Sequence, residues 1–209
     1  MRKTDVLTLF DYMYWVNERV LDAAEQLGAE EFVAPSNVTT RDLRATLVHE
    51  LDVEWSWRLN LQGRLSEDEE DLRPEDYADA AALRAHWRRD EAEMREWLDT
   101  LTDEQLAADV DSGLTRDRRP LWHYLVHIFT HATQQQADAA TLLSLAGRSP
   151  GDLGFPQYLR TAAVAQRVRR DALGTAIRET AGAMVGRPGW MSPDEVTRWV
   201  DDLRSEETE

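Results

Sequence analysis

The sequence predicts an all-α protein, an antiparallel four-helix bundle followed by a C-terminal helical extension. Strand-like alternation of apolar and polar residues is scarce, and charged residues recur at helical spacing. Four long segments stand between residues that typically begin or end helices. Such helices pack together as a bundle. We therefore divide the 209 residues into a bundle, residues 1–155, and an extension, residues 156–209.

The first predicted helix runs from about Asp5 to Leu27 and ends near Gly28. Its apolar residues recur at helical spacing and form one stripe: Leu9, Met13, Val16 and Val20. The second helix is expected to begin with Thr39 or Thr40 as its cap, to have Asp42 in its first turn, and to stop near Gly63.

The third predicted helix spans roughly Asp79 to Leu101, after an acidic segment, residues 66–76, that we interpret as a solvated loop. Its candidate core residues are Trp87, Met94, Trp97 and Leu98. Residues 108–115 give a weak signal for an extended or hairpin segment. The fourth helix has Pro120 in its first turn, and Gly147 is its expected C-terminal stop.

The extension is expected to form a helix over 157–184 and a short final helix capped by Ser192. It carries a basic cluster, Arg167, Arg169 and Arg170, in an acidic protein. Two interpretations fit this cluster: a solvated helix face, or a face that docks on another surface. We expect the extension to fold against its own bundle or a partner subunit, mainly through apolar contact.

Composition excludes several classes of function. The absence of cysteine removes disulfides, zinc–thiolate sites and cysteine nucleophiles. Acidic residues outnumber basic ones by 40 to 24, which disfavours binding to nucleic acid and to anionic membranes. Asp5 stands where a signal peptide would begin its apolar run, so we expect a cytoplasmic protein. Only Lys3 is lysine among the basic residues, which suggests a GC-rich bacterial genome.

The histidines carry the most informative chemistry. His123, His127 and His131 recur every four residues on the fourth helix, so neighbours share one face. His49 lies in the middle of the second helix. Two histidines at this spacing, with a third from another helix, provide three nitrogen ligands and leave positions open for a substrate. Histidines that only form hydrogen bonds in the core fit the same spacing, and His86 is expected to be solvated.

Three segments resemble one known family. They are the first-helix pattern over residues 10–21, the second helix from Leu43 through His49 to Gly63, and the fourth helix from Trp122 with the closing loop 147–152. In this order they are similar to the DinB/YfiT-like superfamily of bacterial four-helix bundles. The resemblance covers about residues 5–159.

The resemblance implies a divalent metal ion, zinc or nickel, held by three histidines. His49 and His131 match two ligand positions directly. Gln135 occupies the position where a third histidine is usual, and His127, one turn before His131, is the alternative ligand. The predicted metal site is therefore His49, His131 and His127, with Gln135 as the second choice for the third ligand.

Two functions follow as expectations. The first is a metal-dependent transferase or hydrolase acting on a small molecule. The resemblance suggests a thiol S-transferase that uses a low-molecular-weight thiol and forms a homodimer. Asp52, Glu54 or Asp138 would then support the ligands or act as a base. The second is a non-catalytic, stress-related binding or interaction module with a degenerate metal site, which Gln135 favours.

Overall fold

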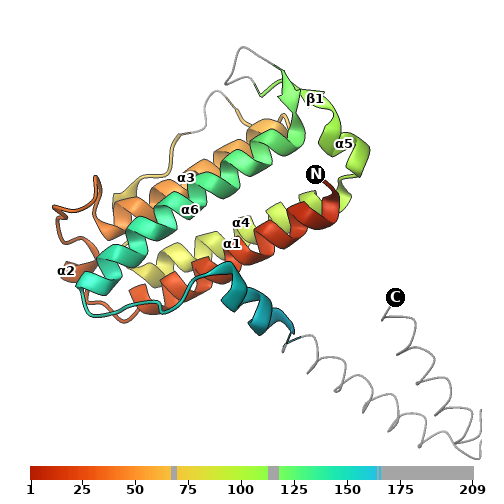
Figure 1. Cartoon of the computed structure of the whole chain (residues 1–209). Coiled ribbons are helices and arrows are strands. Elements are labelled where there is room, and N and C mark those ends of the chain that lie inside the picture. The colour runs from red at the N-terminus through yellow and green to blue at the C-terminus, as the bar shows by residue number, and fades with distance from the viewer. Residues whose placement is uncertain (67–69, 113–117, 164, 166–209) are drawn as a thin grey trace, which may run out of the picture. The chain divides into compact units, whose positions relative to one another are not determined.

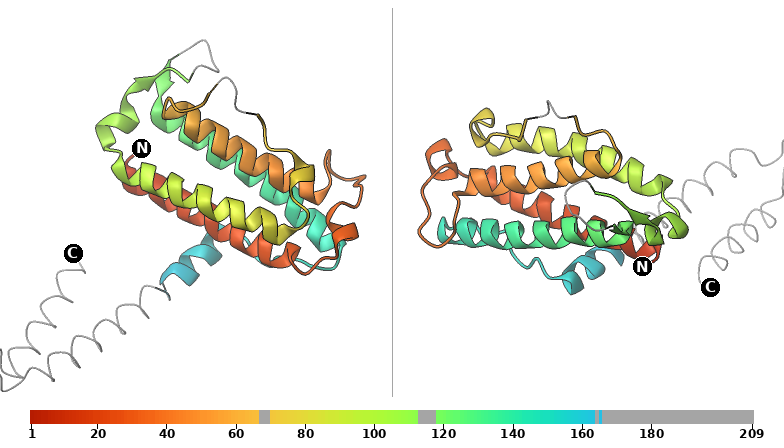
Figure 2. Two further views of the ribbon diagram at one scale, coloured as in Figure 1. Left: turned by 180° about the vertical axis from the view of Figure 1, so that it is seen from behind. Right: turned by 90° about the horizontal axis from the view of Figure 1, so that it is seen from above.

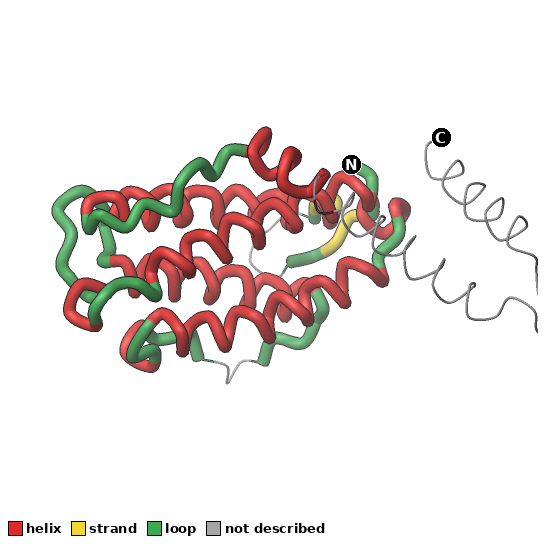
Figure 3. The backbone as a smooth tube through the Cα atoms, turned by 90° about the horizontal axis from the view of Figure 1, so that it is seen from below, coloured by secondary structure: helices red, strands yellow, loops and turns green. Residues whose placement is uncertain are grey.

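The structure is a computed structural model that describes residues 1–66, 70–112, 118–163 and 165. The elements, in chain order, are α1 (Lys3–Ala24), α2 (Ala29–Phe32), α3 (Leu43–Leu61), η1 (Pro74–Asp76), α4 (Ala80–Thr100), α5 (Asp103–Ala107), β1 (Asp109–Val110), β2 (Arg119–Pro120) and α6 (Leu121–Leu145). Over these residues the chain is all-α apart from the short antiparallel pair β1–β2 (Figure 3). No helix of the described residues combines the length and the apolar character that a membrane crossing needs.

The chain divides into two compact units, Met1–Leu153 and Gly154–Glu209. In the second unit the structure describes residues 154–163 and 165, of which 155–163 and 165 are helical. The basic cluster of the extension, most of its first predicted helix and its final helix lie outside the described residues.

Four long helices, α1, α3, α4 and α6, form the bundle of the first unit, in which α1 and α3 each pack against both α4 and α6 (Figures 1 and 2). Helices α3 and α6 are antiparallel, because His49 meets His131 whereas Trp57 stacks on Tyr124. Salt bridges from Arg84 to Glu18 and from Arg95 to Asp11 show that α1 and α4 are also antiparallel.

The other two neighbouring pairs run parallel. Glu54 contacts Trp87 and Arg58 contacts Asp90, so α3 and α4 point the same way. Two consecutive helices can run parallel only if the segment that connects them returns along the length of the bundle. The acidic segment between α3 and α4 was predicted as a solvated loop. Its described part returns along α3, where the Leu72 N–H donates to Asp52, and contains the short helix η1.

The core follows the predicted apolar stripes. Two clusters of buried side chains fill the bundle, one toward each end. Most of the predicted core residues are buried: Met13, Val16, Val20, Trp87, Met94 and Leu98. Leu9 and Trp97 are only partly buried.

The helix boundaries differ from the prediction mainly at their caps. Asp42, rather than Thr39 or Thr40, caps α3, because its carboxylate accepts the Ala45 N–H at 2.8 Å. The Thr39 hydroxyl instead bonds the carbonyl of Arg41. At the C-terminal end of α6, Gly147 has φ +73°. The Arg148 N–H donates a backbone hydrogen bond to the Leu143 carbonyl, as in a Schellman motif.

Candidate metal centre

His49 and His131 meet at the interface of α3 and α6. Their Nε2 atoms are 3.2 Å apart, and the rings are nearly perpendicular, with centroids 4.9 Å apart. Both side chains are partly buried. The sequence predicted that these two histidines would face each other across the bundle, and the structure places them so.

Both imidazoles are held in the neutral form at neutral pH. Burial is the largest cause that lowers the pKa of His131, to about 4, and the nearby His49, His127 and Arg41 lower it further. Burial also lowers the pKa of His49, with the same Arg41 adding to the effect and Asp52 opposing it. A neutral imidazole has a free lone pair, which metal coordination requires.

The two nitrogens fit a shared cation. Ligands about 2.0–2.1 Å from a tetrahedral zinc ion lie roughly 3.3–3.4 Å from one another. The observed 3.2 Å separation of the Nε2 atoms is close to that value. In the absence of a cation, the same distance fits an N–H···N hydrogen bond with one ring as the donor. The buried Nδ1 atom of His131 has no hydrogen-bond partner in the described part of the chain.

The third predicted ligand stands apart from this pair. The His127 side chain is exposed, its ring centroid is 6.3 Å from that of His131, and it packs edge-on against Trp57 at 4.9 Å. Gln135, the other candidate, is buried with 8% of its surface exposed. Within the described ranges no three His, Cys, Asp or Glu side chains come together as a group that could hold a metal ion. To complete a three-ligand metal site, the pair would therefore need either a ligand of another kind or a movement of the His127 side chain.

The two remaining histidines are separate from the pair. His123 is exposed and packs against the neighbouring Trp122. His86 was predicted to be solvated, but the structure corrects this: its Nδ1 is 2.6 Å from the Tyr77 hydroxyl and the two rings stack. The segment that carries Tyr77 covers this part of α4, which the sequence of α4 alone does not reveal.

Of the three acidic residues predicted to support the metal ligands or act as a base, Asp52 and Glu54 form hydrogen bonds that hold the fold. The Asp52 carboxylate accepts the Leu72 N–H at 2.8 Å and so holds the α3–α4 connection against α3. Glu54 accepts hydrogen bonds from the Tyr14 hydroxyl and from Trp87 Nε1 inside the bundle. Asp138 is partly exposed on α6.

A buried polar network next to the histidine pair was not predicted. Gln136 Nε2 donates to Glu50 Oε1 at 3.0 Å and to the Met13 carbonyl at 3.2 Å, and it also contacts the Asn17 amide. Burial raises the pKa of Glu50 well above its usual range, and that of Glu54 to about 8. The sequence shows only that Glu50 and Glu54 interrupt the apolar face of α3 at i, i+4 spacing, and it does not show which residues bind them.

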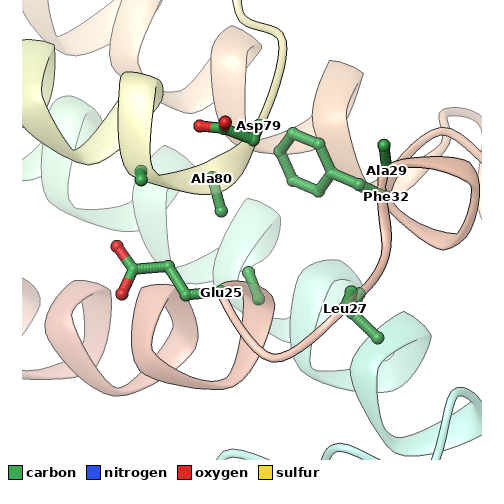
Figure 4. Close-up of a pocket in the computed structure, with 8 residues that line it drawn as sticks. Glu25, Leu27, Ala29, Phe32, Asp79 and Ala80 are labelled. Carbon is green, nitrogen blue, oxygen red and sulfur yellow. The ribbon is translucent and has the colours of Figure 1, made fainter.

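One of the pockets of the bundle lies away from the histidines. It is formed where α1 ends, beside α2 and the start of α4. Figure 4 labels these residues that line it: Glu25, Leu27, Ala29, Phe32, Asp79 and Ala80. Asp79 caps α4 there, and Glu25 pairs with Arg84. Its acidic groups therefore already have structural roles.

Fold and site together define a four-helix bundle protein with two partly buried histidines that meet between α3 and α6. Comparison with known proteins places it further: the model of the DinB family matches residues 1–171, and the chain belongs to that family. Among solved structures, a conserved protein from Enterococcus faecalis is similar, with a TM-score of 0.48 and 18% identity over 69% of this chain and 97% of the other. No curated protein matches the sequence.

Proposed function

We propose that this protein is a metal-dependent enzyme that binds one divalent cation, zinc or nickel, between His49 and His131. The observation that carries the proposal is the 3.2 Å separation of two neutral imidazole Nε2 atoms held by different helices. Imidazole nitrogen suits both metals. Membership of the DinB family, which is generally metal-associated, supports the same conclusion.

His127 is our first choice for the third ligand and Gln135 the second. The His127 ring is exposed and lies one helical turn from His131, so a change of side-chain rotamer away from Trp57 costs little burial. Gln135 lies one turn on the other side and is already buried, but its amide oxygen is a weaker ligand for these metals.

The reaction that suits this arrangement is transfer of a thiol sulfur to a small electrophile. A bound divalent metal would lower the pKa of a coordinated thiol and so supply the thiolate nucleophile. In this chain the two neutral histidines would hold the metal, and the buried walls of α3 and α6 would restrict water. The substrate would be a low-molecular-weight thiol, and we propose a cytoplasmic homodimer, as the family resemblance implies.

The competing function is a non-catalytic binding or interaction module. Two observations favour it: glutamine stands at position 135, and the described residues hold no third His, Cys, Asp or Glu side chain beside the pair. In that case His49 and His131 would form an ordinary hydrogen bond in the core.

Metal analysis of the protein purified without a histidine tag separates the two functions. We expect about one zinc or nickel ion per chain after dialysis at neutral pH, and loss of that metal in His131→Ala. Exposed His123→Ala is the matched control and should keep its metal. Wild-type protein that takes up no divalent metal would rule out the metal-dependent enzyme and leave the binding module.

A further inference from the structure

We propose that Trp57 is a positioning residue that holds His127 away from the histidine pair, so that His127 must leave Trp57 in order to bind the metal ion. This inference rests on the metal site proposed above and concerns how its third ligand is controlled. The observations that carry it are the distances from the His127 ring to Trp57 and to His131, and the packing that fixes Trp57 itself.

His127 stands between two alternatives along the interface of α3 and α6. It lies one helical turn before His131 on α6, and Trp57 lies about two turns after His49 on α3. Because the two helices are antiparallel, His127 and Trp57 are displaced from the histidine pair toward the same end of the bundle. A side chain on a helix leans toward the N-terminus, which at His127 is the direction away from His131.

The His127 ring is closer to Trp57 than to the histidine pair. Its centroid is 4.9 Å from that of Trp57, with an interplanar angle of 60°, and 6.3 Å from that of His131. Two imidazoles bound to one tetrahedral zinc ion have ring centroids roughly 5 Å apart. The 4.9 Å between His49 and His131 fits such an arrangement, whereas the 6.3 Å between His127 and His131 is too long. The His127 ring therefore has to move away from Trp57 before it can bind the same ion.

Trp57 is fixed by its surroundings, so His127 is the partner that moves. The Trp57 ring stacks on Tyr124, with centroids 5.6 Å apart and an interplanar angle of 28°. Tyr124 is only 5% exposed, and Trp57 packs against the apolar cluster at this end of the bundle. His127, by contrast, is exposed and can change its rotamer without disturbing that cluster.

The contact between Trp57 and His127 opposes metal binding by a measurable amount. An edge-on pair of aromatic rings contributes a free energy, beyond its buried area, that corresponds to about two- to tenfold in a binding constant. Because this contact and coordination by His127 exclude each other, removing the contact favours the metal-bound form by the same factor. A purely structural role for Trp57 predicts the opposite sign, since lost packing would weaken the site.

The zinc affinity of single variants tests this sign, measured by competition with a chromogenic chelator. Trp57→Leu removes the ring and should bind zinc about two- to tenfold more tightly than wild type. Trp57→Phe keeps an aromatic ring beside His127 and should stay within about twofold of wild type. Trp122 packs edge-on against His123 at 4.0 Å, so Trp122→Leu is the matched control and should leave the affinity unchanged.

The effect must also pass through His127. In a His127→Ala background, Trp57→Leu should change the zinc affinity by less than about twofold, because the side chain that Trp57 holds is gone. NMR of the wild-type protein gives a second readout. Nuclear Overhauser contacts between the His127 and Trp57 rings should disappear as zinc is added, while the ring signals of His49 and His131 shift. This measurement needs no variant, so misfolding of Trp57→Leu would not hide the result.

The outcomes separate this inference from the proposed function. If wild type binds zinc, then equal or weaker binding by folded Trp57→Leu, or retained contacts between His127 and Trp57 in the zinc-bound protein, would overturn the inference alone. Zinc uptake by Trp57→Leu but not by wild type would support the inference and show that Trp57 blocks the site. No uptake by either protein would overturn the inference together with the metal-dependent enzyme.

Discussion

His131 lies in the middle of α6 with one candidate ligand a helical turn away on each side. His127 is exposed against Trp57, and Gln135 is buried. The order of metal affinity among single variants should therefore identify the third ligand. We expect His127→Ala to weaken zinc binding at least about tenfold, as loss of a ligand does, and Gln135→Ala to change it less.

Competition with a chromogenic zinc chelator measures this difference. The control is His123→Ala, which removes an exposed histidine from the same helix. The reverse order, with Gln135→Ala the more damaging variant, would assign the site to Gln135. Equal, small effects of both would mean that neither side chain completes the site.

The raised pKa of Glu54 predicts how the free energy of unfolding depends on pH. Its pKa is raised from 4.5 to about 8 by burial, with nearby acidic charges adding to the effect. Between these values the unfolded carboxyl ionises while the folded one stays protonated, so the free energy of unfolding should fall as pH rises from about 4.5 to about 8. Glu54→Gln removes this contribution. It should reduce the slope of the free energy of unfolding against pH by up to about 1.4 kcal/mol per pH unit.

Urea denaturation at several pH values between 5 and 9 checks this prediction. Glu96→Gln, an exposed change on α4, controls for the loss of one negative charge. Curves for wild type and Glu54→Gln that run parallel over the whole range would contradict a protonated Glu54 in the core.

At the scale of residues, the sequence predicted the histidine pair but not its polar surroundings. His49 and His131 were identifiable because spacing and family motif point to the same face of each helix. Glu50 and Glu54 are residue types usually found at the surface, and only their partners show why they are buried. Gln136 donates a hydrogen bond to Glu50, and Tyr14 and Trp87 donate hydrogen bonds to Glu54. Hydrogen-bond partners that come from three other helices leave no local pattern.

At the scale of elements, the parallel pair α3 and α4 is joined by a buried ion pair. Arg58 and Asp90 have side chains 2% and 1% exposed, and Arg58 also contacts Glu93 at 2.8 Å. Removing Asp90 leaves the buried Arg58 charge with Glu93, whose side chain is 52% exposed, as its remaining ion-pair partner. We expect Asp90→Ala to lower the free energy of unfolding by about 3–5 kcal/mol.

Urea denaturation of three variants distinguishes this pair from a surface contact. Asp76→Ala breaks the exposed pair with Arg73 and should cost less than about 1 kcal/mol. The double variant Arg58→Met with Asp90→Leu should recover most of the loss, because both buried charges are gone. A double variant no more stable than Asp90→Ala would show that side-chain packing, not charge, dominates there.

The helices themselves were predictable, whereas their directions were only partly so. Apolar periodicity and stop residues such as Gly147 locate α1, α3, α4 and α6 to within a few residues. The apolar pattern within one helix does not show which other helices pack against it. The parallel arrangement of α3 and α4 depends on the contacts of Arg58 and Trp87, which link residues more than thirty positions apart. The short helices α2 and α5 were missed because each has only about one turn of periodicity.

At the scale of the whole molecule, the role of the extension is open to a direct test. The sequence beyond residue 156 carries apolar residues at helical spacing together with Trp190 and Trp199. Burying them against the bundle or a partner would stabilise the protein, since apolar contact outweighs exposed ion pairs. We expect deletion of residues 157–209 to lower the melting temperature or to dissociate the proposed homodimer.

Thermal unfolding and light scattering of the full chain and of residues 1–156 measure both effects. The shorter chain contains all of the first compact unit, Met1–Leu153, so it should still fold as a helical bundle. An unchanged melting temperature together with an unchanged molecular mass per particle would show that the extension neither stabilises the bundle nor joins subunits.

The central claim is that His49 and His131 hold one metal ion between them. X-ray absorption at the zinc edge of the tag-free, zinc-loaded protein tests it most directly, because imidazole ligands have a recognisable scattering pattern. We predict one zinc per chain with at least two imidazole nitrogens at about 2.0–2.1 Å, and loss of that pattern in both His49→Ala and His131→Ala. A zinc shell of oxygen atoms alone, or one that stays the same in either variant, would contradict the claim.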